Sequence, residues 1–133
     1  MKTRPMLTLE DCRRISAAAE AEAKRNNWNV CIAILDDGGH LLHLARMDGA
    51  SPANARIAVE KGRTAAESRR SSAVWEERNK AGRNSMLGMP GITPVQGGLP
   101  IMAEGVCLGG VGVSGVQSTE DEQIAAAGIK ALA

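Results

Sequence analysis

The first part of the chain carries apolar residues in a helical repeat. Small or apolar side chains recur every three to four positions, at Cys12, Ile15, Ala19 and Ala23. Charged and polar residues fill the positions between them, so this pattern predicts an amphipathic helix over residues 9–25. Thr8 and Asp11 have the spacing of a helix N-cap and a first-turn carboxylate, and we expect the helix to begin after Thr8.

After this helix the apolar residues become nearly continuous, which is typical of a buried strand. Residues 28–35 are mostly apolar and partly β-branched, and they predict a strand covered on both faces. The Asp-Asp-Gly-Gly segment at 36–39 has the composition of a tight turn. Residues 40–46 predict a second strand, so the two strands form a β-hairpin.

A second helix follows the hairpin. Ser51 and Pro52 have the positions of an N-cap and a first-turn proline, and they predict a helix from 52 to about 70. Residues 67–88 mix charges of both signs, and we expect a solvated helical extension or a loop there. Residues 89–98 are rich in turn-forming residues.

The last part of the chain predicts a second hairpin and a closing helix. Residues 99–102 and 106–115 have the composition of strands, and residues 118 to about 132 begin with the hydroxyl and acidic residues of a helix start. The predicted order is helix, strand, strand, helix, strand, strand, helix. Because hairpins build antiparallel sheets, we predict an α+β fold with helices packed on an antiparallel sheet. No repeat or linker divides residues 1–133, so we expect a single domain.

Composition narrows the class of protein. The chain has 16 Lys and Arg against 15 Asp and Glu, a formal net charge of +1. A nucleic-acid-binding domain normally has a strong basic excess, so nucleic acid is not an expected partner. No apolar run approaches the ~18 residues of a membrane span, and the N-terminal residues lack the apolar region of an export signal. We therefore expect a cytoplasmic protein with no membrane partner.

The scarcity of aromatic residues predicts self-association. There is no Phe and no Tyr, and the two Trp are Trp28 and Trp75. A core of Ala, Gly, Val, Ile, Leu and Met buries little apolar area per residue. Because each Å² of buried apolar surface stabilises the fold by roughly 25 cal/mol, such a core contributes little stability per residue. Apolar surface buried between subunits would add to the small area buried within each one, so we predict a homo-oligomer.

The three cysteines have no metal-site or disulfide spacing and are expected to be buried free thiols.

Residues 110–115 contain the Gly-x-Gly-x-x-Gly pattern of dinucleotide-binding proteins. A dinucleotide site also needs a further strand and an acidic residue ~20 positions later. The residues after 115 predict only one helix, so a nucleotide site is not expected. Two interpretations remain open. Main-chain N–H groups near the last helix form an anion pocket, or the glycines allow close packing of the strand.

Arg46, Asp48 and Lys61 are candidates for binding a carboxylate. Arg46 lies at the end of a predicted strand beside a glycine turn, where a guanidinium can bind a carboxylate through two parallel hydrogen bonds. The alternative is a structural ion pair between Arg46 and either Asp48 or Asp121. Lys61 lies in a small, apolar helical stretch, so it either extends past the core to solvent or faces the same pocket.

The two histidines, His40 and His43, are three residues apart in a predicted strand. This spacing places them on opposite faces, so we predict no metal site built from both. Either one alone remains a candidate axial ligand of a haem iron. Met89 and Met102 lie near glycine turns and suit either the core or the apolar wall of a pocket for a flat ligand.

Several segments, taken in order, resemble one known family. They are Val-Cys-Ile-Ala-Ile-Leu-Asp-Asp-Gly-Gly at 30–39, Arg-Met-Asp-Gly-Ala at 46–50, Gly-Gly-Leu-Pro-Ile at 97–101, Gly-Val-Gly-Val-Ser-Gly at 110–115 and Asp-Glu-Gln-Ile-Ala-Ala-Ala-Gly at 121–128. Together with the helix that contains Lys61, they span nearly the whole chain. On these motifs the sequence resembles the GlcG/HbpS family, which is related to the C-terminal domain of PduO.

The resemblance implies a profilin-like or roadblock-like α-β-α sandwich that assembles as a dimer, tetramer or octamer. It also implies a pocket at a subunit interface near the glycine strand. Some family members bind haem or other tetrapyrroles, and others are encoded beside catabolic genes. On the matching motifs, the expected ligand-binding residues are Arg46, Asp48, Lys61, Gly97, Gly98, Ser114, Gly115 and Asp121. The resemblance identifies no haem ligand here.

Two functions are consistent with these residues. In the first, the oligomer binds haem, another tetrapyrrole or a small carboxylate in a glycine-lined pocket at or near a subunit interface. In the alternative, the protein is a small catabolic lyase, isomerase or hydrolase acting on a carboxylated metabolite. Arg46 would then anchor the carboxylate, and Asp48, Glu122 or a nearby histidine would move a proton. The sequence contains no complete catalytic set, so we favour binding over catalysis. A purely structural subunit would have no pocket.

Overall fold

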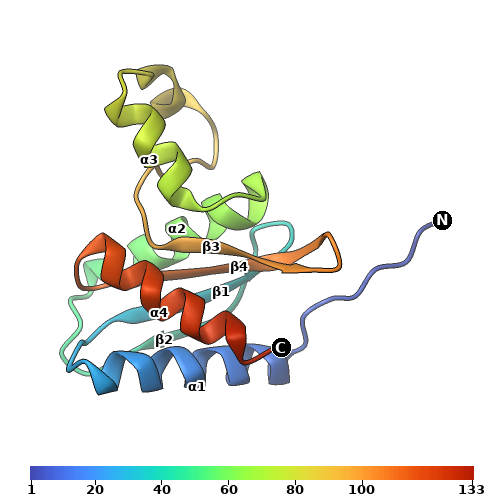
Figure 1. The fold of residues 1–133 in the computed structure, drawn as a ribbon, viewed down its shortest axis with the longest axis vertical. Helices are drawn as coiled ribbons and strands as arrows, with labels where there is room; N and C mark the ends of the chain where they lie inside the picture. Colours follow the sequence, from blue (N-terminus) through green and yellow to red (C-terminus); the bar gives the residue numbers. More distant parts are fainter.

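The computed structural model describes residues 1–133 and shows one antiparallel sheet between two layers of helices (Figure 1). The four strands lie in the order β2-β1-β4-β3. Helices α1 and α4 lie side by side over one face, and α2 covers the other. The strands are β1 (Cys31–Asp36), β2 (Leu41–Arg46), β3 (Gly98–Ala103) and β4 (Val106–Ser114). The helices are α1 (Leu9–Arg25), α2 (Ala53–Ser68), α3 (Ser72–Lys80) and α4 (Ser118–Lys130), with one 3-10 helix, η1 (Asn84–Gly88).

The predicted α+β sandwich is confirmed, with one helix more than expected. The sequence predicts an extension or a loop over residues 67–88, whereas the structure has the separate helix α3 there. Helix α2 ends because Arg69 adopts a left-handed conformation with φ of 59°. Ser71 then starts α3 by accepting a hydrogen bond from the Ala73 N–H. The order is therefore α-β-β-α-α-β-β-α, and α3 and η1 stand away from the sheet (Figure 1).

The start of α1 is the one that the sequence predicts. The Thr8 hydroxyl accepts the Asp11 N–H at 3.1 Å, and the Asp11 carboxylate accepts the Thr8 N–H at 2.9 Å. This reciprocal capping satisfies two N–H groups that are otherwise free at a helix start. The predicted start of α2 is one residue early, because the helix begins at Ala53 and its N-cap is Pro52.

The main core lies between the sheet and the α1–α4 pair. It contains 14 buried residues, among them the large side chains Ile15, Ile32, Ile34, Ile101 and Ile124. Because helices cover both faces of β1, every residue from Cys31 to Leu35 is buried, as predicted. The three cysteines are free and buried, which confirms their expected role as small core residues.

On the opposite face, α2 rests directly on the backbone of β4. A Cβ at Gly112 would lie 1.9 Å from the Ala58 carbonyl oxygen, and a Cβ at Gly110 would lie 2.4 Å from the Gly62 carbonyl oxygen. Neither position has space for a side chain, so these glycines serve close packing. The buried cluster on this face is correspondingly small: Cys31, Ala33, Leu35, Ala50 and Ala58.

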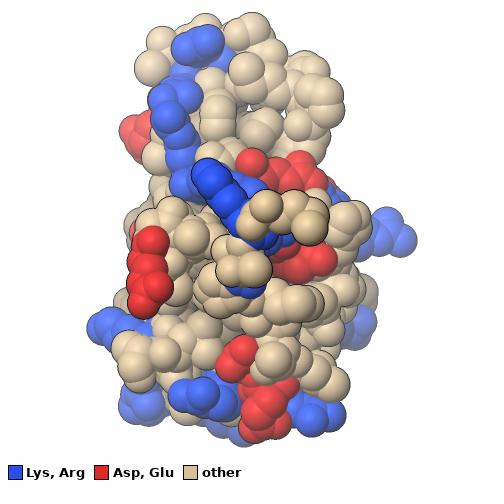
Figure 2. Space-filling model, turned by 90° about the vertical axis from the view of Figure 1, so that its right-hand side faces the viewer, with Lys and Arg blue, Asp and Glu red and all other residues tan.

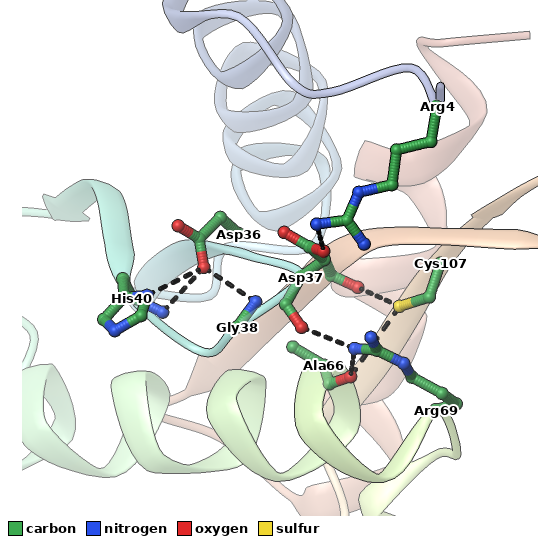
Figure 3. A network of polar contacts seen from close by, with 9 residues as sticks. Arg4, Asp36, Asp37, Gly38, His40, Ala66, Arg69 and Cys107 are labelled. Atoms are coloured by element: carbon green, nitrogen blue, oxygen red, sulfur yellow. Dashed lines mark hydrogen bonds and ion pairs between the residues drawn. The ribbon is translucent and has the colours of Figure 1, made fainter. Parts of the chain in front are cut away.

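Polar contacts tie the β1–β2 turn to the C-terminal end of α2 (Figure 3). The Asp36 carboxylate accepts two N–H groups of the turn, both at 2.9 Å. The Arg69 guanidinium donates to the carbonyl oxygens of Asp37 and Ala66. Arg4 of the N-terminal segment forms an ion pair with the Asp37 side chain. These contacts fix the turn end of the hairpin relative to α2.

Candidate ligand sites

The expected site residues gather at one end of the sheet. Arg46 of β2 lies opposite Cys31 of β1, which lies opposite Ser114 of β4. Since neighbouring strands are ~4.8 Å apart, the backbones of Arg46 and Ser114 are roughly 10 Å apart. The expected ligand-binding residues fall into a buried group and an exposed group. The buried residues are Lys61, Gly97, Gly98, Ser114 and Asp121, and the exposed residues are Arg46, Asp48 and Gly115.

Lys61 and Asp121 form an ion pair at the centre of the buried group. Their side chains are 3% and 2% exposed, and 3.0 Å separates Nζ from Oδ2. Nζ also donates to the Val113 carbonyl at 3.0 Å, and Oδ1 of Asp121 accepts the Val116 N–H at 3.1 Å. Burial raises the pKa of Asp121, against the opposing effects of the Lys61 ammonium and the hydrogen bonds. The pair joins α2, β4 and α4. The sequence analysis expected Lys61 either to extend to solvent or to face a pocket, and the structure shows a buried ion pair instead.

Gly97 and Gly98 pack against Lys61. A Cβ at Gly98 would lie 2.1 Å from the Lys61 carbonyl oxygen, and one at Gly97 would lie 2.8 Å from Nζ. The Gly98 N–H donates to Ser72 Oγ at 2.8 Å, and the Gly97 carbonyl accepts the Val113 N–H at 3.0 Å. Neither of the two cavities described below has a glycine in its lining. Within one copy, the glycines therefore do not build the pocket that the sequence analysis expects.

The start of α4 is closed by its own residues. The Glu120 carboxylate accepts the Gln117 N–H at 3.2 Å, and the Asp121 carboxylate accepts the Val116 N–H at 3.1 Å, so acidic side chains of the helix take N–H groups that an anion would otherwise bind. Glu122 accepts a hydrogen bond from Ser71 Oγ at 3.0 Å, so this carboxylate is tied to the start of α3. Of the two carboxylates considered for proton transfer, Asp48 lines the same hollow as Arg46, and Glu122 does not.

Arg46 and Asp48 line a polar hollow of about 290 Å³ between α1 and the end of β2. The full lining is Glu20, Lys24, Asn29, Arg46, Met47 and Asp48. Lys24 and Glu20 pair with each other at 3.7 Å. Arg46 pairs with neither Asp48 nor Asp121, so the structural ion pair considered from sequence is absent. The hollow therefore offers one unpaired guanidinium and one unpaired carboxylate.

A larger, apolar cavity of about 560 Å³ lies between the N-terminal segment, the β3–β4 hairpin and the end of α4. Nine of its 12 lining residues are hydrophobic. The lining is Pro5, Met6, Leu7, Asp11, Ile101, Met102, Ala103, Leu108, Ile129, Lys130, Leu132 and Ala133. Sites for small organic ligands are typically apolar, roughly 300–1,000 Å³ in volume, and contain a few polar groups. Met102, singled out from sequence, lines this cavity, whereas Met89 does not.

The donor atoms at this cavity are compatible with a haem group. Met6 and Met102 bring thioethers, which ligate haem iron in some proteins, and Lys130 brings an ammonium group. Neither histidine lines the cavity. His40 is exposed and lies beside an aspartate of its own turn, and Nδ1 of His43 is buried without a hydrogen-bond partner. The histidines are therefore separate from the cavity that best suits a flat apolar ligand.

Charges of both signs are spread over the surface. Lys and Arg side chains lie among Asp and Glu over most of the face in Figure 2. No group of three or more His, Cys, Asp or Glu side chains comes together as a metal site would require. None of the helices has the length and apolar character needed to cross a membrane.

These features define an α-β-α sandwich protein with a four-stranded antiparallel sheet and an apolar cavity at one edge. The family model described as "Haem degrading protein HbpS-like" matches residues 7–130. The chain therefore belongs to the HbpS-like family, which confirms the resemblance seen in its motifs.

Individual relatives agree with this assignment. The protein GlcG of Escherichia coli strain K12 is 46% identical over 114 residues, which are 86% of this chain and 85% of that protein. A double mutant of Streptomyces reticuli HbpS has a TM-score of 0.91 and 30% identity, covering 100% of this chain and 91% of that one. The PduOC:heme complex has a TM-score of 0.86 and 24% identity over 96% of this chain and 95% of that one, and it shows the shared fold.

Proposed function

We propose that this protein binds haem or a related tetrapyrrole, acting as a single cytoplasmic domain within a homo-oligomer. The cavity of about 560 Å³ carries the proposal, because it is mostly apolar and has a lysine in its lining. A tetrapyrrole is flat and largely apolar and carries carboxylates at its edge, so it needs an apolar wall and a nearby cation. The description of the family, which names haem, supports the same ligand class.

The cavity residues have distinct roles in this proposal. Met6 and Met102 offer thioether ligands to the iron, and Lys130 pairs with a carboxylate of the ligand. The apolar wall excludes water from the bound group. When bound, the haem supplies redox-active iron, and the chain supplies binding and orientation.

The buried residues at the other end of the sheet support this site indirectly. Lys61, Gly97, Gly98, Ser114 and Asp121 are packed among α2, β3, β4 and α4. We therefore assign them a structural contribution, in which they hold the helices in place on the sheet, and no direct contact with a ligand bound by a single copy.

Haem titration tests the proposal. Wild-type protein should give a saturable Soret shift with haem at micromolar concentration. Ala103→Trp fills the cavity and should weaken binding by about tenfold or more, whereas Ala21→Trp, an exposed position on α1, should leave it unchanged. Met102→Leu should retain binding and change the Soret position. No shift in the wild type, or equal binding by Ala103→Trp, would exclude this site.

The polar hollow favours a second candidate function, a small catabolic lyase, isomerase or hydrolase. The unpaired Arg46 guanidinium can bind a carboxylate with two hydrogen bonds, and Asp48 lies beside it as the proton acceptor. Lys24 in the same hollow is paired with Glu20, so Arg46 is the one cation of the lining left free for a carboxylate. A monocarboxylate is therefore the expected substrate class.

An NMR titration separates this candidate from haem binding. Acetate should shift the Asp48 amide signal in the wild type, and succinate should bind more weakly. Arg46→Ala should abolish the shift, and Arg83→Ala, an exposed control, should preserve it. Equal acetate binding by Arg46→Ala would remove the proposed role of Arg46.

A further inference from the structure

The segment before α1 forms one wall of the apolar cavity. Pro5, Met6 and Leu7 belong to the lining, and residues 1–8 contain no helix or strand. The segment leaves the start of α1 beside the C-terminal residues, and residues from both chain ends line the cavity (Figure 1). We call residues 4–7 the strap.

The strap differs from the other walls of the cavity in its backbone. No backbone–backbone hydrogen bond involves residues 1–7. The other lining residues lie in α1, β3, β4 and α4, except for Leu132 and Ala133, whose N–H groups donate to Ile129 and Lys130. A segment without backbone hydrogen bonds opens at a lower free energy than the helices and strands around it. The strap is therefore the wall that can move while the fold stays intact.

The strap is fastened at its two ends. Leu7 is 6% exposed and belongs to the main core, and Thr8, the next residue, caps α1. At the other end, Arg4 forms an ion pair with the Asp37 side chain in the β1–β2 turn (Figure 3). Met6 lies between these points and is 79% exposed, so little apolar burial holds the middle of the strap. The Arg4–Asp37 pair is thus the polar contact that holds the free end of the strap.

The Asp37 side of this contact is held in place without Arg4. Arg69 donates to the Asp37 carbonyl, and the Asp36 carboxylate accepts two N–H groups of the same turn. The side chains of Arg4 and Asp37 are 58% and 25% exposed. Exposed ion pairs are weak and are screened by salt, so this pair can break without disturbing the turn. Such a contact is suited to repeated opening.

We propose that the strap opens and closes over the apolar cavity, with the Arg4–Asp37 pair as its latch, and that it sets the rate of ligand release. The inference rests on the ligand binding in the proposed function and adds its regulation. Opening removes Met6, one of the two thioethers offered to the iron, together with one apolar wall, whereas Met102 stays in place on β3. A bound tetrapyrrole contacts the closed strap, so the latched state retains it longest.

Backbone NMR relaxation of the ligand-free protein tests the movement. The Met6 amide should have an order parameter near that of rigid backbone at low salt, and a lower one in Arg4→Gln and in Asp37→Asn. The double variant should show no further decrease, because either change alone removes the latch. Added salt should lower the value in the wild type only. Arg13→Gln is the matched control, because Arg13 is 62% exposed, pairs with Glu10 and does not line the cavity.

Stopped-flow release measures the effect on the ligand. Haem should transfer to an excess of haem-free globin about two- to fivefold faster from Arg4→Gln or Asp37→Asn than from the wild type, the change expected for an exposed ion pair. Arg13→Gln should release haem at the wild-type rate. Anilinonaphthalene sulfonate, an apolar anionic dye, is the second probe, and its release can be measured without haem.

Each outcome decides the inference. A less ordered Met6 and faster release in both latch variants support the strap. A Met6 amide that is equally ordered in the wild type and the latch variants overturns it, and so does a release rate that neither variant changes. If the wild type binds no haem but both latch variants release the dye faster, the strap is retained and the haem proposal is excluded.

Discussion

Replacing Lys61 by Met tests the central ion pair most directly. Methionine has a similar length and no charge, so Lys61→Met keeps the shape of the core and leaves the Asp121 carboxylate buried without its partner. The Val113 carbonyl also loses its donor. Breaking a buried pair by removing one partner costs about 3–5 kcal/mol. A domain of this size has roughly 5–15 kcal/mol of stability, so the loss should be large and measurable.

The loss should depend on pH. Burial already raises the pKa of Asp121, and removing the Lys61 ammonium raises it further. The folded variant then binds a proton more readily than the unfolded chain, in which an Asp has a pKa of about 3.9. Stability therefore falls as pH rises from this value through the folded-state pKa. The loss in free energy of unfolding caused by Lys61→Met, relative to the wild type, should be smallest in mild acid and largest at neutral pH.

Urea unfolding followed by circular dichroism measures these differences. The double variant Lys61→Met/Asp121→Asn removes both charges, so it should be less destabilised than the sum of the two single variants, by about 1–3 kcal/mol. Lys80→Met is a matched control, because the Lys80 side chain is 67% exposed. If Lys61→Met lost under 1 kcal/mol at neutral pH, or the two single effects were additive, the pair would not have the assigned energetic role.

Three further predictions concern packing, capping and thiol burial. Gly112→Ala should destabilise the fold by more than about 3 kcal/mol in thermal unfolding, because its Cβ would lie 1.9 Å from a carbonyl oxygen. Gly88→Ala, with no atom within 4 Å of its Cβ, should be close to neutral. Thr8→Ala should lower the free energy of unfolding by about 1 kcal/mol, measured by circular dichroism, because the Asp11 N–H loses its acceptor. A variant as stable as the wild type would show that the Thr8 cap does not stabilise α1. Burial raises the pKa of the Cys12 and Cys31 thiols, so they should resist a disulfide reagent at neutral pH until urea unfolds the chain; rapid labelling of the folded protein would contradict this.

The elements of the fold were predictable because each has a local signal. The helical repeat and the Thr8–Asp11 spacing define α1, and both depend on residues within one or two turns. The continuous apolar run from Cys31 to Leu35 marks a strand covered on both faces. The sequence allowed a helical extension over residues 67–88 but did not predict α3 as a separate helix, since the break depends on the left-handed conformation of Arg69, a residue type with no sequence signal for that role.

The sites were less predictable, because they depend on residues that are distant in sequence. Lys61 and Asp121 were both singled out, but 60 positions separate them, and either could have faced solvent. A lysine in a small-residue helix and an aspartate at a helix start are the available signals for such a pair. The apolar cavity is assembled from both chain ends and a hairpin, and no single segment of it differs from an ordinary core or surface.

The contact of α2 with β4 has a mechanical consequence. Where the Ala58 carbonyl meets Gly112, no rotamer can change to absorb a displacement. A hydrogen bond holds each end of the same helix: Arg63 donates to the Gly39 carbonyl of the hairpin turn, and Ser114 of β4 donates to Asn54. One helix in direct backbone contact with the sheet therefore connects the hairpin turn to the opposite end of β4.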